Sequence, residues 1–265
     1  MRIILPIKQV PETAGVRMDE QTGTMIREGV EAIINPLDLY AIEAAIRLRE
    51  TCGGDCVAIS MGPPAAAKAL REAIAMGVDS AVLISDKAFA GSDTWATSYT
   101  LAAAIRRLPA YDLIICGERA TDGDTGQVGP GIAAFLDLPV LTYVSKLDSV
   151  SDGVCRAHRL VEDGYEVLEM RLPGVITVLK EAANPRLPTL RGKQKAKKAE
   201  TPTWGAADIG VDADKVGLRG SPTRVIRVFR PSLARKCEMV IAQDEAAINE
   251  AADRLVAMLR GRGLL

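Results

Sequence analysis

Short runs of β-branched and aliphatic residues alternate with stretches of helical periodicity over about the first 180 residues. We interpret the runs at 3–7, 56–60, 81–84 and 112–116 as strands. The fourth run is almost entirely apolar, as expected of a central strand in a parallel sheet. Strands and helices that alternate in this way form βαβ units. The pattern therefore predicts an α/β fold, with a mostly parallel sheet and helices on both faces.

Helix boundaries can be placed from capping residues. A helix is predicted at 36–50, with Asn35 as its N-cap and a proline in its first turn. The next helix follows the second strand and ends at Gly77, and a third helix begins at a cap formed by Ser92 or Asp93. Each helix connects two predicted strands, so each is expected to be a right-handed crossover.

Beyond about Val140 the pattern changes to alternating apolar and polar residues. Runs at 141–150, 154–161 and 166–172 are separated by glycine-containing turns. They predict an antiparallel addition to the sheet. A further buried strand is predicted at 175–179.

The last third of the chain has a different character. Residues 186–199 carry six basic side chains and no acidic one, which is most often a solvated loop. Residues 201–231 are rich in Gly, Pro and Asp and resemble an extended arm. Residues 244–260 predict an amphipathic helix, whose apolar face would either fold back on its own domain or dock on a partner subunit.

Composition excludes several classes of protein. A net charge of -1 over 265 residues argues against a nucleic-acid-binding or membrane-surface protein. No apolar run reaches the ~18 residues of a transmembrane helix, and the apolar N-terminus is too short for a signal peptide. Five cysteines without a C-x-x-C pair fit a reducing cytoplasm better than a disulfide framework or a zinc site. The single histidine, His158, lies in a charged, alternating stretch, so histidine-based catalysis is not expected.

The most informative segment is the glycine-rich stretch that follows the predicted strand at 112–116. Ligands of open α/β sheets bind at the carboxyl ends of strands. Glycines at 117, 123, 126 and 129 allow close approach, Thr125 and Gln127 offer side-chain donors, and the following helix start presents N–H groups suited to phosphate. We predict a nucleotide phosphate at residues 123–129. Glycine-rich loops before helices are also often only tight turns, so on spacing alone both interpretations stay open.

Other ligand motifs do not fit this segment. G-x-x-x-x-G-K-[ST] is absent, and no G-x-G-x-x-G follows the first strand. Asp122 and Asp124 suggest a calcium loop, but Gly126 and Ala133 then occupy the fifth and twelfth positions, where ligands are required. A metal is not expected here.

The segment Ala120-Thr121-Asp122-Gly123-Asp124-Thr125-Gly126-Gln127-Val128-Gly129-Pro130 closely resembles the nucleotide loop of electron-transferring flavoprotein beta subunits, including the FixA-type proteins. Further matches follow the same order along essentially the whole chain. They are Lys8-Gln9-Val10-Pro11, Asn35-Pro36-Leu37-Asp38, Met61-Gly62-Pro63, Leu172-Pro173-Gly174-Val175-Ile176-Thr177-Val178, Asn184-Pro185-Arg186 and Lys195-Ala196-Lys197-Lys198-Ala199.

The resemblance implies an adenine nucleotide alpha-hydrolase-like domain that pairs with a larger alpha subunit carrying FAD. It also implies a division into a nucleotide-binding α/β domain at 1–183, a recognition loop and extended arm at 184–243, and a partner-docking helix at 244–265. Pro6 departs from the small residue expected at its position. Carried over by position, the nucleotide contacts fall on Pro6, Asn35, Asp38, Met61, Gly117, Ala120, Thr121, Asp122, Gly123, Asp124, Thr125, Gly126, Gln127, Val128 and Gly129.

Two cofactors are compatible with the resemblance. Ordinary members bind a structural AMP at this subunit, whereas the electron-bifurcating branch binds a second FAD. The loop looks like the bifurcating type, as do the tail at 192–200 and the run at 220–223, and Thr13 stands where ordinary members often have an aromatic residue. We therefore predict FAD, with AMP as the alternative.

Resemblance to the electron-bifurcating branch implies NADH as electron donor. It also implies ferredoxin or flavodoxin as one electron acceptor, and an acyl-CoA dehydrogenase or quinone reductase as the other. The family's recognition loop for the dehydrogenase falls around 184–190. No side chain is expected to be catalytic, because the flavin performs the chemistry. Two alternatives remain: an ordinary carrier whose beta subunit binds AMP structurally, and a nucleotide-binding module like the universal stress proteins, whose late glycine-rich phosphate signature we do not find.

Overall fold

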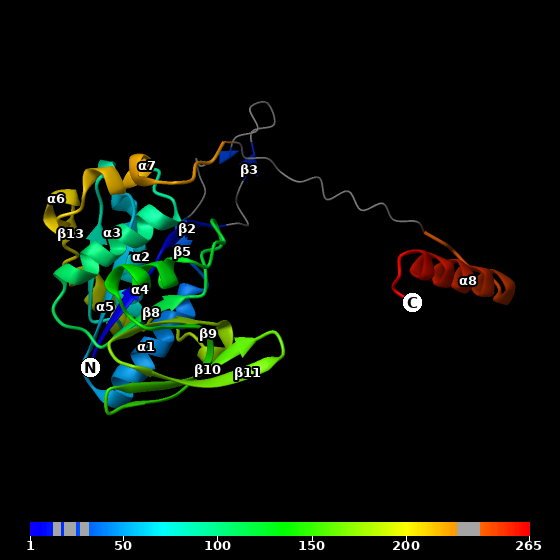
Figure 1. Cartoon of the computed structure of the whole chain (residues 1–265), viewed down its shortest axis with the longest axis horizontal. Helices are drawn as coiled ribbons and strands as arrows, with labels where there is room; N and C mark the ends of the chain where they lie inside the picture. Colours follow the sequence, from blue (N-terminus) through cyan, green and yellow to red (C-terminus); the bar gives the residue numbers. More distant parts are fainter. Residues whose placement is uncertain (13–16, 19–24, 27–31, 227–238) are drawn as a thin grey trace. The chain divides into compact units, whose positions relative to one another are not determined.

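The computed structural model describes residues 1–12, 17–18, 25–26, 32–226 and 239–265 (Figure 1). Thr13 lies outside the described residues. The chain divides into two compact units, Met1–Val228 and Phe229–Leu265. Each unit is described by itself below.

In the described part of the first unit, nine strands form one sheet in the order β11-β10-β9-β12-β8-β1-β6-β7-β13. These strands are β1 (Arg2–Pro6), β6 (Asp55–Met61), β7 (Ser80–Ile84), β8 (Leu113–Gly117), β9 (Val140–Ser151), β10 (Val154–Val161), β11 (Gly164–Arg171), β12 (Gly174–Val178) and β13 (Thr203–Trp204). Two small sheets pair β2 (Gln9–Pro11) with β5 (Ala32–Ile34) and β3 (Arg17–Met18) with β4 (Met25–Ile26).

The parallel strands reverse their order at the middle of the sheet. From β1 the chain moves outward through β6 to β7, and it then crosses back to β8 on the other side of β1. β12 continues in parallel beyond β8. The topological switch point therefore lies between β1 and β8, which is where open α/β sheets bind ligands. The mostly parallel sheet predicted from the sequence is confirmed.

Helices cover both faces of this sheet, as predicted. The helices are α1 (Asp38–Cys52), α2 (Ala67–Met76), α3 (Thr94–Arg107), α4 (Val128–Leu136), α5 (Leu190–Lys198), α6 (Ala206–Ile209), α7 (Gly217–Gly220) and α8 (Glu245–Gly261), with 3-10 turns η2 (Pro64–Ala66), η3 (Lys87–Phe89), η4 (Lys180–Ala182) and η5 (Ala213–Lys215). α1 and α2 pack on the face that contains Ile3 and Ala58, while α3 and α4 pack on the face that contains Ile4 and Ile59. Neighbouring strand residues point to opposite faces, so the central strands β1, β8 and β12 are apolar along most of their length.

The predicted helix starts need two corrections. α1 begins at Asp38, after a turn at 36–37, and Asn35 is not its N-cap. The Asn35 side chain is used elsewhere, as shown below. α4 begins at Val128, so Gly129, which the sequence placed in the stretch before the helix, lies inside the helix. At α3 the cap is Asp93, one of the two predicted residues, and its carboxylate accepts the Ala96 N–H.

The predicted antiparallel addition is confirmed. β10 pairs antiparallel with both β9 and β11. β9 also runs parallel to β12, so the three strands prolong the main sheet instead of forming a separate one. The buried side of these three strands adds Val144, Cys155 and Met170 to the core beneath α1 and α2.

The basic run is not only a loop. Residues 190–198 form α5, whose N-cap Thr189 accepts the Gly192 N–H and whose Ala196 is buried against the core. The following residues also form short elements where an extended arm was expected, since β13 pairs in parallel with β7 at the edge of the sheet. The division at 183 and 243 stays a prediction.

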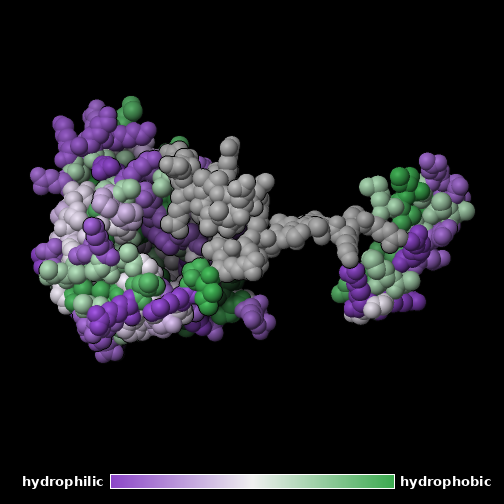
Figure 2. Space-filling view, turned by 90° about the horizontal axis from the view of Figure 1, so that it is seen from above, coloured by the Kyte–Doolittle hydropathy of each residue, from purple (hydrophilic) through white to green (hydrophobic). Residues whose placement is uncertain are grey.

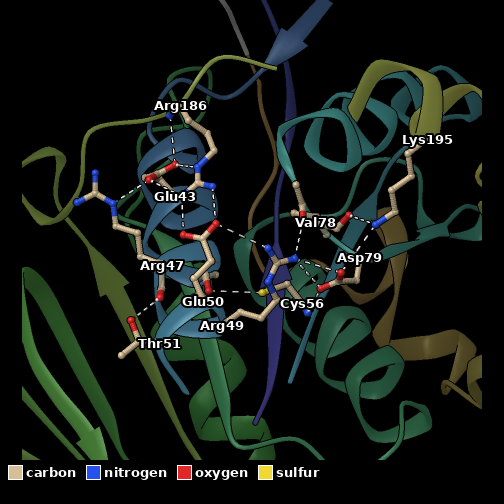
Figure 3. A network of polar contacts seen from close by, with 12 residues as sticks. Glu43, Arg47, Arg49, Glu50, Thr51, Cys56, Val78, Asp79, Arg186 and Lys195 are labelled. Atoms are coloured by element: carbon tan, nitrogen blue, oxygen red, sulfur yellow. Dashed lines mark hydrogen bonds and ion pairs between the residues drawn. The ribbon is translucent and has the colours of Figure 1, made fainter. Parts of the chain in front are cut away.

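Arg186 fixes the segment that leads into α5 (Figure 3). Its guanidinium donates to Glu43 at 2.8 Å and to Glu50 at 2.6 Å, both on α1, and its backbone N–H also donates to Glu43. Glu43 is only 2% exposed and accepts a further bond from Arg47. Burial tends to raise the pKa of Glu43, but the bonds from Arg186 and Arg47 outweigh it and hold that pKa below its usual range. The Arg186 guanidinium is therefore a structural clamp between the two segments.

In the second unit, the amphipathic helix predicted at the C-terminus is present as α8. Asp244 caps it by accepting the Ala247 N–H. In the described residues of this unit none of the helix is buried, and Ile248, Leu255 and Met258 are about half exposed. Apolar and polar side chains share its surface (Figure 2). Among the described residues, no helix has the length and apolar character needed to cross a membrane.

Candidate functional site

The sequence-predicted contact residues lie at the carboxyl ends of neighbouring strands. Pro6 ends β1, Met61 ends β6 and Gly117 ends β8. The segment at 118–127 then connects β8 to α4 and will be called the glycine loop. Residues 121–125 and Gln127 in this loop are exposed, whereas Gly129 is buried. Met61 packs instead against the core on the α3 and α4 side.

Asn35 joins the start of α1 to the glycine loop. Its Nδ2 donates to Asp38 Oδ1 at 2.9 Å and to the Arg119 carbonyl at 2.8 Å. Its Oδ1 accepts the Thr121 N–H at 3.2 Å. Both amide hydrogens are thus used within the protein. Asn35 shapes the loop from a buried position, which explains why it does not cap the helix.

Asp38 lies beneath the same loop. Its Oδ2 accepts the backbone N–H of Lys8 at 2.7 Å, so the carboxylate links β1 to α1. Burial raises the pKa of Asp38 to about 7, although the bonds from Lys8 and Asn35 favour the charged form. Gly117 is required here for packing, because a Cβ on it would lie 2.3 Å from Asp38 Oδ1.

Replacing Asp38 with asparagine should change how stability depends on pH. The folded chain holds the Asp38 proton up to about pH 7, while the unfolded chain releases it near 3.8. Wild-type stability should therefore fall relative to Asp38→Asn as pH rises between these values, by about 1.4 kcal/mol per pH unit. Urea unfolding of both chains from pH 4 to 8 measures this difference. A difference that stays constant with pH would contradict the assigned pKa.

The glycine loop offers backbone donors to an anion. The Asp124 N–H donates to the Ala120 carbonyl at 2.8 Å and closes a turn, and Gly126 has φ +63°. Among the described residues, the backbone N–H groups of Gly123, Thr125 and Gly126 have no protein acceptor. The N-terminus of α4 follows directly, and its first N–H groups also favour an anion. This arrangement fits a phosphate group.

Charged side chains around the loop are paired with one another. Lys8 Nζ lies 2.7 Å from Asp122 Oδ1, which joins the ends of β1 and β8 across the switch point. Arg119 Nε lies 3.2 Å from Asp124 Oδ1. Binding of an anion would therefore depend first on the backbone donors, with Lys8 available if it leaves Asp122.

Two residues next to the glycine loop, Lys8 and Tyr143, were not predicted from the sequence to belong to the site. Lys8 belongs to a recognised motif but had no role of its own. Tyr143 had no signal at all, because the alternating pattern of β9 does not reveal that its backbone has φ +55°. Its Oη lies 3.9 Å from the position a Cβ on Gly126 would take.

Comparisons with known proteins show the family to which the chain belongs. The model of the electron transfer flavoprotein domain matches residues 22–209. The chain is 44% identical over 266 residues to the caffeyl-CoA reductase-Etf complex subunit CarD of Acetobacterium woodii, which covers 100% of both chains. It is 46% identical over 256 residues to an electron transfer flavoprotein subunit beta of Thermoanaerobacterium thermosaccharolyticum, covering 96% of this chain and 98% of that one. It is 46% identical over 265 residues to Protein FixA of Azorhizobium caulinodans, covering 97% and 93%. The chain therefore belongs to the electron transfer flavoprotein family, with beta subunits and FixA proteins among its relatives.

Proposed function

We propose that this chain is the beta subunit of a heterodimeric electron-transferring flavoprotein of the bifurcating type, and that it holds FAD at the switch point. The observation that supports this most is the glycine loop, in which Gly123, Thr125 and Gly126 present N–H groups at the carboxyl end of β8 that have no acceptor in the described part of the chain. Backbone donors of this kind bind phosphate oxygens without a lysine-containing P-loop.

The residues of this chain bind and orient the nucleotide and need no catalytic side chain. The loop N–H groups and the α4 N-terminus hold the phosphates. Asn35 and Asp38 hold the loop in the shape that presents those groups. FAD bound here would accept hydride from NADH and supply single electrons to ferredoxin or flavodoxin and, through the alpha subunit, to an acyl-CoA dehydrogenase or quinone reductase.

FAD is favoured over AMP by the sequence of the loop, Gly123-Asp124-Thr125-Gly126-Gln127-Val128-Gly129, which resembles that of the bifurcating type. AMP remains the alternative, because the same N–H groups also suit one phosphate. An AMP-containing subunit would have a structural role, with redox chemistry confined to the alpha subunit.

The cofactor content of the co-purified heterodimer tests this proposal. Visible absorption and mass spectrometry of released nucleotides should give two FAD molecules per heterodimer. One FAD and one AMP would indicate the ordinary carrier. A heterodimer with no adenine nucleotide at this subunit would overturn the assignment of the glycine loop, and with it the proposed function.

The redox partner would meet the segment between Arg186 and α5. Leu187 and Leu190 there are 86% and 83% exposed, and they stand beside the basic residues of α5. Exposed apolar side chains with cations around them suit an apolar pocket with an acidic rim, and the cations would steer the approach of such a partner. We assign this surface to the partner dehydrogenase.

The apolar side of α8 would dock on the alpha subunit. Truncation before Asp244 should weaken assembly at least about tenfold, because the exposed Ile248, Leu255 and Met258 would no longer be buried in the complex. Pull-down and analytical ultracentrifugation with the alpha subunit measure the loss. Glu250→Ala on the opposite side of the helix is the control and should assemble normally. Unchanged assembly of the truncated chain would refute the docking role.

A further inference from the structure

Tyr143 stands in a β-bulge at the carboxyl end of the sheet. In the β9–β12 register, Leu141 is opposite Ile176 and Val144 is opposite Val178. Two residues of β9, the second of which is Tyr143, therefore face Thr177 alone. A bulge of this kind bends its strand and turns a side chain in a new direction, and bulges are frequent next to active sites.

The backbone of Tyr143 has a conformation that large side chains rarely adopt. Among the described residues, the other non-glycine residues with positive φ are Asp124, Asp137 and Asp152, whose short polar side chains tolerate it. Tyr143 is kept there by Thr177, whose Oγ1 accepts the Tyr143 N–H at 3.1 Å. Strained residues of this type gather at ligand sites, because the surrounding structure must hold them in place.

The bulge brings the phenol to the glycine loop. Tyr143 Oη lies 3.9 Å from the position of a Cβ on Gly126, whose N–H has no protein acceptor in the described chain. The side chain is 46% exposed, and within the described residues its hydroxyl has no protein partner. Thr177 also packs beneath the start of α4, since its Cγ2 would be 2.6 Å from a Cβ on Gly129. One residue thus positions both the phenol and the helix start.

We propose that Tyr143 is a ligand-contacting residue of the nucleotide site. Its Oη donates a hydrogen bond to a phosphate oxygen that the N–H groups near Gly126 also hold, and its ring shields that phosphate from water. The ligand class is the phosphate of an adenine nucleotide, which AMP and FAD share. This inference rests on the proposed function and adds a contact that lies on a different strand from the glycine loop.

The test uses the full chain in complex with its alpha subunit, stripped of nucleotide and titrated calorimetrically with AMP and with FAD. Tyr143→Phe removes only the hydroxyl and should weaken both ligands about tenfold, as for one hydrogen bond to a charged acceptor. Tyr143→Gly should weaken them further while thermal stability is kept or raised, because glycine adopts this φ freely. Tyr165→Phe, an exposed tyrosine on β11, is the matched control and should bind like wild type.

Two results would overturn the role of Tyr143 while the proposed function stands. One is wild-type affinity of Tyr143→Phe for both nucleotides. The other is weakening for FAD alone, which would place the contact beyond the shared phosphate. Failure of the wild-type complex to bind either nucleotide would overturn both the inference and the proposed function.

Discussion

Gly126→Val is expected to eliminate nucleotide from this subunit and to leave the chain folded. Gly126 has φ +63°, where a β-branched residue is strained by about 1–2 kcal/mol. The loop would relieve that strain by rotating its backbone, and the N–H groups of Thr125 and Gly126 would no longer point at a common phosphate. Released nucleotide per heterodimer, measured by absorption and mass spectrometry, should fall from two equivalents of FAD to one, which is the FAD of the alpha subunit.

Gly153→Val provides a matched control for this experiment. Gly153 has φ +74° and, like Gly126, has room for a side chain, but it lies in the turn between β9 and β10. Both variants should lose similar stability in thermal unfolding, and Gly153→Val should keep its nucleotide. Full nucleotide content in Gly126→Val would mean that the glycine loop does not hold the phosphate.

Arg186→Ala should lower the free energy of unfolding by about 3 kcal/mol at neutral pH. The substitution removes the clamp and leaves the buried Glu43 with Arg47 as its remaining cation within the described residues. In wild type, burial tends to raise the pKa of Glu43, and the bonds from Arg186 and Arg47 hold it low. Without Arg186 this pKa should rise. The Arg186 clamp stabilises wild type when Glu43 is charged, so its contribution is lost as pH falls through the folded pKa. Urea unfolding as a function of pH should show the two chains converging in acid.

Arg191→Ala is the control for the clamp, since Arg191 belongs to the same basic run but is exposed and has no partner among the described residues. Its stability should stay within about 0.5 kcal/mol of wild type. Arg186→Ala should also weaken binding of the partner dehydrogenase, because Leu187 would lose its fixed position. Equal stability of the two variants would show that the clamp contributes nothing to the fold.

The main elements were predictable because their signals are local. Strand runs, the cap at Asp93 and the turns of the antiparallel strands each depend on a few neighbouring residues. The site was less predictable, because its contacts join residues far apart in the chain. Asn35 has the chemistry of an N-cap, but the glycine loop 84 positions away takes its amide hydrogen. A rule based on neighbouring residues cannot predict that this long-range hydrogen bond replaces the helix cap.

The glycines are a second case in which the sequence alone did not predict the contacts of the site. Gly117 and Gly129 were predicted to admit a ligand, yet the positions of their missing side chains are filled by Asp38 and Thr177. Gly126 does have the positive φ that only a glycine adopts easily. A glycine in a sequence marks a close approach without saying whether the neighbour is a ligand or the protein itself. The site prediction itself awaits the nucleotide measurements above.

The double use of Thr177 restricts how this subunit can be altered. Its hydroxyl holds the bulge of β9 and its methyl group packs beneath the start of α4, so the loop after β8 and the bend in β9 cannot be redesigned one at a time. Valine at this position would keep the shape beneath α4 but release the bend, and serine would do the reverse. Engineers who wish to change which dinucleotide or mononucleotide is accepted should therefore vary positions 126, 143 and 177 together in one library.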